Sequence, residues 1–143
     1  MDYATCSVSC TDSKVVVQEN QSRFEVINKS KLKITKVQVD GCLINDDREK
    51  CDWIIEVEKS KEDKHALFIE LKGCNLDKAI SQLQSTLNDT KDRYKSHHKE
   101  CYAVTSRVPK HGATVRKRNL EFHKKNNVVL FVKNLRASIQ IEN

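Results

Sequence analysis

The chain has 143 residues, 38% of them hydrophobic and 32% charged, with three Gly and one Pro. This fits one domain spanning residues 1–143 and excludes both a disordered chain and long flexible linkers. The net charge of +6 is unevenly spread, because residues 1–87 carry 13 Lys+Arg against 15 Asp+Glu, whereas residues 88–143 carry 13 against 5. A basic C-terminal part favours nucleic acid as a partner, although a solvated lysine-rich surface explains the same charges equally well.

The first half of the chain predicts strands. Residues 1–13 are polar and are expected to be loosely ordered, and two short apolar patches follow at residues 15–17 and 24–27. Polar and apolar residues alternate along residues 32–44, as they do in a strand with one buried face. Two more strands are expected to complete a three-stranded meander, with strands at 51–58 and 66–72 and charged turns at 45–50 and 59–64.

The hydrophobic period changes after Gly73. Apolar residues three and four positions apart predict an amphipathic helix with Asn75 as its N-cap, running as far as Tyr94, and its stripe comprises Leu76, Ala79, Ile80, Leu83 and Leu87. Further on we expect a strand, a basic helix and one or two terminal strands, at 102–104, 113–125, 128–132 and 135–141. The sequence therefore predicts an α/β fold, with a mixed central sheet of about four to five strands flanked by helices.

Cysteine usage and hydropathy bear on the compartment. The six cysteines could pair in a secreted protein, but residues 1–20 lack the basic start and apolar stretch of a secretory signal. No apolar run is long enough to cross a bilayer. We therefore expect reduced thiols in a cytoplasmic protein without a membrane partner.

Three charged residues are expected to meet at one edge of the meander. Alternation along residues 66–72 puts Glu70 and Lys72 on the same face of an otherwise apolar strand. Asp52 begins the preceding strand, and in an antiparallel hairpin the start of one strand lies beside the end of the next. Two carboxylates suit Mg²⁺ or Mn²⁺, and Lys72 beside them would orient an attacking water or offset negative charge on a phosphate.

This pattern resembles the PD-(D/E)XK superfamily of restriction-endonuclease-like nucleases, over roughly residues 34–104. The motif of that family is an acid that enters one strand and a (D/E)-x-K triplet that ends the next. Here Cys51-Asp52 is followed, after 17 residues, by Glu70-Leu71-Lys72 and then by a predicted helix. The resemblance implies a restriction-endonuclease-like core, metal binding at Asp52, Glu70 and Leu71, and catalytic roles for Asp52, Glu70, Lys72 and, on the helix, Gln82.

The chain departs from the family pattern at two points. Cys51 stands before the first acid, where the family has proline. Many members also use an additional N-terminal acid, for which Glu25 is the first candidate here, followed by Glu19 and Asp40. These three positions are alternatives.

Several other residues have competing interpretations. Cys42, Cys51 and Cys74 lie near the ends of strands that should be neighbours, so they could bind zinc or an iron–sulfur cluster, as in some relatives. Their spacing fits no standard metal motif, and small buried residues are the favoured reading. Trp53 shares a strand with Asp52 but points to the opposite face, which favours a core position over stacking on a base.

The basic residues of the C-terminal part are candidate phosphate ligands that would bind nucleic acid without reading its sequence. An ordinary solvated face is the alternative. The positions we expect to contact nucleic acid are Lys110, Arg116, Lys117, Arg118, Lys124 and Lys125.

Together these features predict a Mg²⁺- or Mn²⁺-dependent endonuclease that hydrolyses phosphodiester bonds in nucleic acid, with DNA as the favoured substrate. We expect a homodimer or a partner protein that supplies specificity. The first alternative is a catalytically inactive module of the same fold that binds nucleic acid or another protein. The second alternative is a regulatory protein that recognises an acidic partner.

Overall fold

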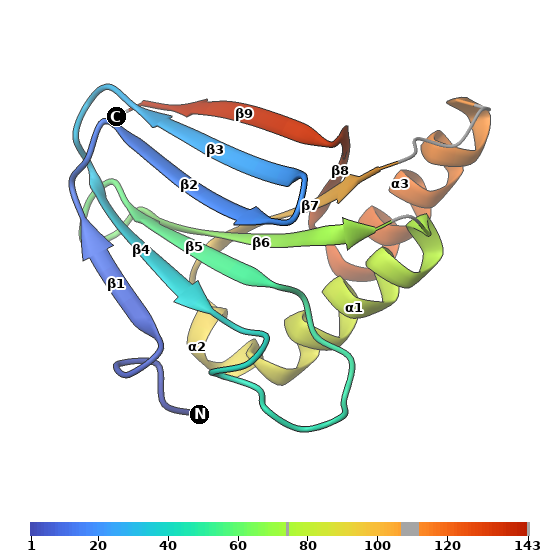
Figure 1. The fold of residues 1–143 in the computed structure, drawn as a ribbon, viewed down its shortest axis with the longest axis horizontal. Coiled ribbons are helices and arrows are strands. Elements are labelled where there is room, and N and C mark those ends of the chain that lie inside the picture. The colour runs from blue at the N-terminus through green and yellow to red at the C-terminus, as the bar shows by residue number, and fades with distance from the viewer. Residues whose placement is uncertain (74, 107–111, 143) are drawn as a thin grey trace.

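The computed structural model describes residues 1–73, 75–106 and 112–142, and for Lys72 and Gly73 it describes the backbone alone. Three layers are stacked (Figure 1). A six-stranded sheet lies in the middle, helices cover one of its faces, and a three-stranded sheet covers the other. The helices therefore flank one face of the central sheet. The other face is covered by the small sheet, so the expectation of helices as the flanking layers is wrong for that face.

The large sheet has the strand order β1-β4-β5-β6-β7-β8. Its central strands β4, β5 and β6 form the predicted antiparallel meander, and β7 and β8 add to it in parallel. The α/β class and the mixed sheet are confirmed, with six strands rather than four or five. The bounds are β1 Ser7–Cys10, β4 Lys33–Gln38, β5 Trp53–Glu58, β6 Lys64–Gly73, β7 His98–Thr105 and β8 Val129–Asn134.

The helices are α1 Leu76–Asp89, α2 Lys91–Tyr94 and α3 Gly112–Asn126. Helix α1 begins where predicted, because the side chain of Asn75 accepts a hydrogen bond from the Lys78 N–H at 3.2 Å. It ends at Asp89 rather than at Tyr94. The Thr90 backbone turns away from the helical conformation, and its N–H and its hydroxyl both donate to the Thr86 carbonyl, at 3.0 and 2.7 Å.

The small sheet consists of β2 Lys14–Glu19, β3 Ser22–Asn28 and β9 Arg136–Ile141. A tight turn joins β2 to β3, in which Asn20 takes the left-handed conformation with φ 51°. Strand β9 pairs with β3 in parallel, although the two strands lie at opposite ends of the sequence. The apolar patches expected at residues 15–17 and 24–27 thus have a partner that the local sequence does not indicate.

Two hydrophobic cores result from the alternation of side chains across the central sheet. Phe68 of β6 belongs to the core under the helices, where the apolar stripe of α1 packs. Leu67 and Ile69 of the same strand face the small sheet and pack with Phe24 and Val26 of β3. Trp53 is partly buried in this second core, as expected for a core residue.

The N-terminal segment is tied into the sheet. Strand β1 pairs with β4, and Cys6 beside it forms a disulfide with Cys42, with the two Cα atoms 5.7 Å apart. The expectations of a loosely ordered segment at residues 1–13 and of reduced thiols at these two cysteines are therefore wrong. The ordered N-terminal segment and the disulfide both result from a long-range strand pairing. Strand β1 lies beside β4 and brings Cys6 to the segment that follows β4.

Candidate functional site

The two predicted acids lie together at the end of β6 where the strand meets α1. The β5–β6 ladder pairs Trp53 with Ile69, so Asp52, one residue before β5, lies beside Glu70. The Asp52 N–H donates to the Ile69 carbonyl at 3.0 Å, and the Leu71 N–H donates to the Asp52 carboxylate at 2.7 Å. Asp52, just before β5, is thus hydrogen-bonded to Ile69 and Leu71, the two residues that flank Glu70 on β6.

Cys51 directly precedes the first acid of the pair. Burial raises the pKa of its thiol, and the negative charges of Glu70 and Asp52 raise it further. Cys51 is fully buried in the core under the helices, and its thiol also contacts the Trp53 carbonyl at 3.6 Å. At the position where PD-(D/E)XK nucleases have proline, the chain therefore has a small apolar residue buried in the core under the helices.

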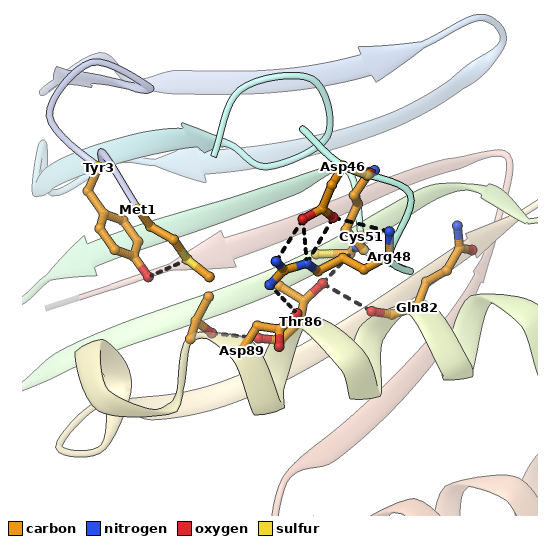
Figure 2. Close-up of polar contacts among 10 residues, drawn as sticks. Met1, Tyr3, Asp46, Arg48, Cys51, Gln82, Thr86 and Asp89 are labelled. Carbon is orange, nitrogen blue, oxygen red and sulfur yellow. Dashed lines mark hydrogen bonds and ion pairs between the residues drawn. The ribbon is translucent and has the colours of Figure 1, made fainter. Parts of the chain in front are cut away.

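Helix α1 holds this part of the chain through Thr86. The Thr86 hydroxyl accepts a hydrogen bond from the Cys51 N–H at 2.8 Å and donates to the Gln82 carbonyl at 3.0 Å (Figure 2). Thr86 is not among the residues predicted from the sequence. A polar residue three positions after Leu83, next to the apolar stripe of α1, was the available signal.

Gln82 is half-buried on α1 one turn before Thr86. In Figure 2 its side chain extends out of the helix on the side where Cys51 lies. Gln82 thus lies on the helix that contacts the Cys51 backbone through Thr86. The side chain of Lys72 lies outside the described residues. Leu71 packs its side chain into the core facing the small sheet, so its backbone carbonyl is the group that could bind a metal.

The three candidates for an additional acid differ in position. Glu25 points away from the central sheet and pairs with Arg23 at 3.0 Å and with Lys14 at 3.9 Å, so it does not join the site. The Asp40 N–H contacts the Asp52 carbonyl at 3.4 Å. Glu19 is on the inward face at the end of β2 and lines a cavity of about 410 Å³ together with Leu71.

The acid pair is covered. The exposed fraction is 3% for Asp52 and 1% for Glu70. The segment between β4 and β5, residues 39–52, packs over this end of the sheet with Val39, Leu43 and Ile44 in the core under the helices. In this conformation the two carboxylates are therefore almost inaccessible to solvent.

Several contacts attach the segment between β4 and β5 to helix α1 and to the N-terminal segment. The Ser81 hydroxyl of α1 donates to the Glu49 carboxylate. Arg48 pairs with Asp46 at 2.7 Å and with Asp89 of α1 at 3.7 Å (Figure 2). These contacts are exposed and contribute little stability individually. The Cys6–Cys42 disulfide is the covalent attachment of the same segment.

The predicted nucleic-acid-binding residues lie on α3, apart from Lys110, which falls outside the described residues. Arg116, Lys117, Lys124 and Lys125 are exposed on the helix. Arg118 instead pairs with Asp77 of α1 at 2.7 Å and with Glu121 at 3.4 Å. The guanidinium of Arg118 therefore already binds two carboxylates.

The cysteines give no support for a metal centre of the kind considered from the sequence. Cys42 is in the disulfide, Cys51 and Cys101 are buried free thiols, and Cys74 lies outside the described residues. Across residues 1–73, 75–106 and 112–142, no three His, Cys, Asp or Glu side chains already surround one point. A metal site at Asp52 and Glu70 would take its third protein ligand from the Leu71 backbone carbonyl. A finding about groups of three side chains therefore does not test that site.

Comparison of the chain with protein-family models, with curated protein sequences and with solved structures gives no match in any of the three. The resemblance to PD-(D/E)XK nucleases therefore depends on the motif residues and their arrangement. None of the helices in the described part of the chain has both the length and the apolar character needed to span a membrane.

Proposed function

We propose that this chain is a Mg²⁺- or Mn²⁺-dependent endonuclease with a restriction-endonuclease-like core that hydrolyses phosphodiester bonds in DNA. The observation that carries the proposal is the 2.7 Å hydrogen bond from the Leu71 N–H to the Asp52 carboxylate, which fixes the first acid beside the strand end that carries Glu70. Two carboxylates and a backbone carbonyl are oxygen donors, which these hard cations prefer. The donor set therefore fits the metal that the motif implies.

Each residue of the motif has a distinct part in the proposal. Asp52 and Glu70 would hold the ion, with the Leu71 carbonyl completing the protein's share. When bound, the ion would supply an activated water and offset charge on the phosphate. Lys72 would orient that water or stabilise negative charge, and Gln82 would approach the same site from α1.

The exposed basic residues of α3 would hold the DNA backbone. Arg116, Lys117, Lys124 and Lys125 can contact phosphates without reading sequence, which suits a nuclease that obtains its specificity elsewhere. Arg118 would instead hold α3 against α1 through Asp77. We propose that the chain acts in the cytoplasm, as a homodimer or with a partner protein that chooses the target.

A second candidate function is a catalytically inactive module of the same fold that binds nucleic acid or protein. The burial of both acids favours it, since 3% and 1% exposure leave no access for a phosphodiester in this conformation. In that case Asp52 serves the fold, because its carboxylate satisfies the buried Leu71 N–H.

The test is cleavage of supercoiled and linear DNA, and of RNA, by the purified chain in Mg²⁺ or Mn²⁺. Asp52→Asn, Glu70→Gln and Lys72→Ala are compared with Glu25→Gln, a matched control because Glu25 lies away from the site. We expect cleavage by the wild type and by the control, with a loss of about 100-fold or more in the three site variants. Cleavage that survives in Asp52→Asn and Lys72→Ala would remove the site assignment. DNA binding without cleavage in either metal would favour the inactive module.

A further inference from the structure

Two histidines lie side by side at the end of β6 and β7 remote from the acid pair. His65 of β6 and His98 of β7 are directly opposite each other in the parallel ladder. Their ring centroids are 5.0 Å apart, with an angle of 64° between the ring planes. Alternation places both on the face of the sheet that carries Leu67 and Tyr102, which is the face covered by the small sheet.

Asp63 fixes one of these rings. Its carboxylate lies 2.9 Å from Nε2 of His65. An ionised carboxylate accepts hydrogen bonds, so in the neutral ring this contact favours the tautomer with the proton on Nε2 and the lone pair on Nδ1. A carboxylate that orients a histidine in this way is the usual support for a metal-binding imidazole, because it sets the tautomer and makes the other nitrogen a stronger donor.

The space around the pair is open and carries further oxygen donors. A cavity of about 400 Å³ lies against both rings, between the starts of β6 and β7 and the end of β9. Glu100 and Glu142 also line it. Glu100 is two residues after His98 and shares its face of β7, so a change of its side-chain rotamer would bring a carboxylate toward the rings.

The geometry points to a second metal site: we propose that His65 and His98 bind a divalent transition metal of the zinc, nickel and copper class. Two imidazoles that share a tetrahedral ion through nitrogen bonds of about 2 Å have ring centroids about 5 Å apart, which is the spacing seen here. The pair supplies two ligands, and water or Glu100 completes the set. Imidazole suits these metals, whereas Mg²⁺ prefers oxygen.

This site is separate from the acid pair and does not depend on the proposed nuclease function. His65 and Glu70 lie on opposite faces of β6, which border different cores, at positions about 17 Å apart along the strand. A metal bound at the histidines would crosslink β6 to β7 beneath the end of β9. Its expected effect is on the stability of the fold.

The experiment is titration of the full chain with Ni²⁺ and Zn²⁺, followed by calorimetry and by the thermal unfolding midpoint. We expect both ions to bind the wild type and raise its midpoint, and Mg²⁺ at the same concentration to have no such effect through the histidines. His65→Ala and His98→Ala should weaken binding by about tenfold or more, and Asp63→Asn by about 10- to 100-fold. His123→Ala, an exposed histidine on α3, is the matched control and should bind as the wild type does.

A second measurement covers the case in which a variant folds poorly. In the unaltered chain, substoichiometric paramagnetic Ni²⁺ should broaden the imidazole NMR signals of His65 and His98 before those of other histidines. Selective broadening, together with the loss in the variants, supports the proposal. Equal Ni²⁺ affinity in the wild type, His65→Ala and His98→Ala, no binding at all, or broadening that begins at another histidine would overturn it.

Discussion

Opening the Cys6–Cys42 disulfide should lower the free energy of unfolding by about 4 kcal/mol, because the bond closes a loop with a sequence separation of 36 residues. This magnitude comes from the loop-closure entropy that the bond removes from the unfolded chain. In the folded protein the same bond attaches β1 to the segment between β4 and β5, which leads directly to Asp52. Reduction should therefore destabilise the N-terminal edge of the sheet first.

Urea unfolding measures this effect directly. We expect the midpoint to fall by about 1 to 4 M between the oxidised and the reduced wild type, given the usual dependence of unfolding free energy on urea. Cys42→Ser should behave as the reduced protein does, with or without reductant. Cys10→Ser is the matched control, because Cys10 is a free thiol in the described part of the chain. Equal midpoints for the oxidised and the reduced wild type would refute the reasoning.

Three further predictions concern the surroundings of the acids and the basic helix. Thr86→Val should lower the free energy of unfolding, measured in urea, by about 1–3 kcal/mol, because it leaves the buried Cys51 N–H without its acceptor. A loss of stability no larger than that of Thr86→Ser would contradict this prediction. Burial and the negative charges of Glu70 and Asp52 raise the pKa of the Cys51 thiol. At pH 8 the Cys51 thiol should therefore resist a thiol reagent that labels the half-buried Cys10, and comparable labelling rates for the two thiols in the folded protein would contradict this prediction. Replacing Arg116 and Lys117 by Ala should weaken DNA binding and reduce the dependence of log affinity on log salt by about two, whereas an unchanged slope would locate the DNA elsewhere.

The elements that the sequence predicted are those with a local signal. The alternation along residues 32–44, 51–58 and 66–72 and the stripe of α1 are properties of consecutive residues, and they give the meander and the helix. Two of the predicted ends are wrong, because β4 ends at Gln38 rather than at residue 44 and α1 ends at Asp89 rather than at Tyr94. The meeting of Asp52 with the end of β6 follows from the same local pattern, because an antiparallel hairpin sets which residues face each other.

The features that the sequence did not predict depend on pairings between distant segments. Strand β3 pairs with β9, and β1 pairs with β4, so the second sheet and the Cys6–Cys42 bond have no local signature. The first candidate for the additional acid, Glu25, failed for the same reason. Phe24 and Val26 face inward once β3 packs on the central sheet, and the intervening Glu25 then faces away from the site.

The most direct test of the account is whether one divalent ion binds at Asp52 and Glu70. Titration of the full chain with Mn²⁺, followed by electron paramagnetic resonance, should show an ion bound by the wild type and by Glu25→Gln. Asp52→Asn and Glu70→Gln should lose that ion while keeping the circular dichroism spectrum of the wild type. Binding of Mn²⁺ with unchanged affinity in both site variants, or an absence of binding in the wild type with DNA present, would contradict the account.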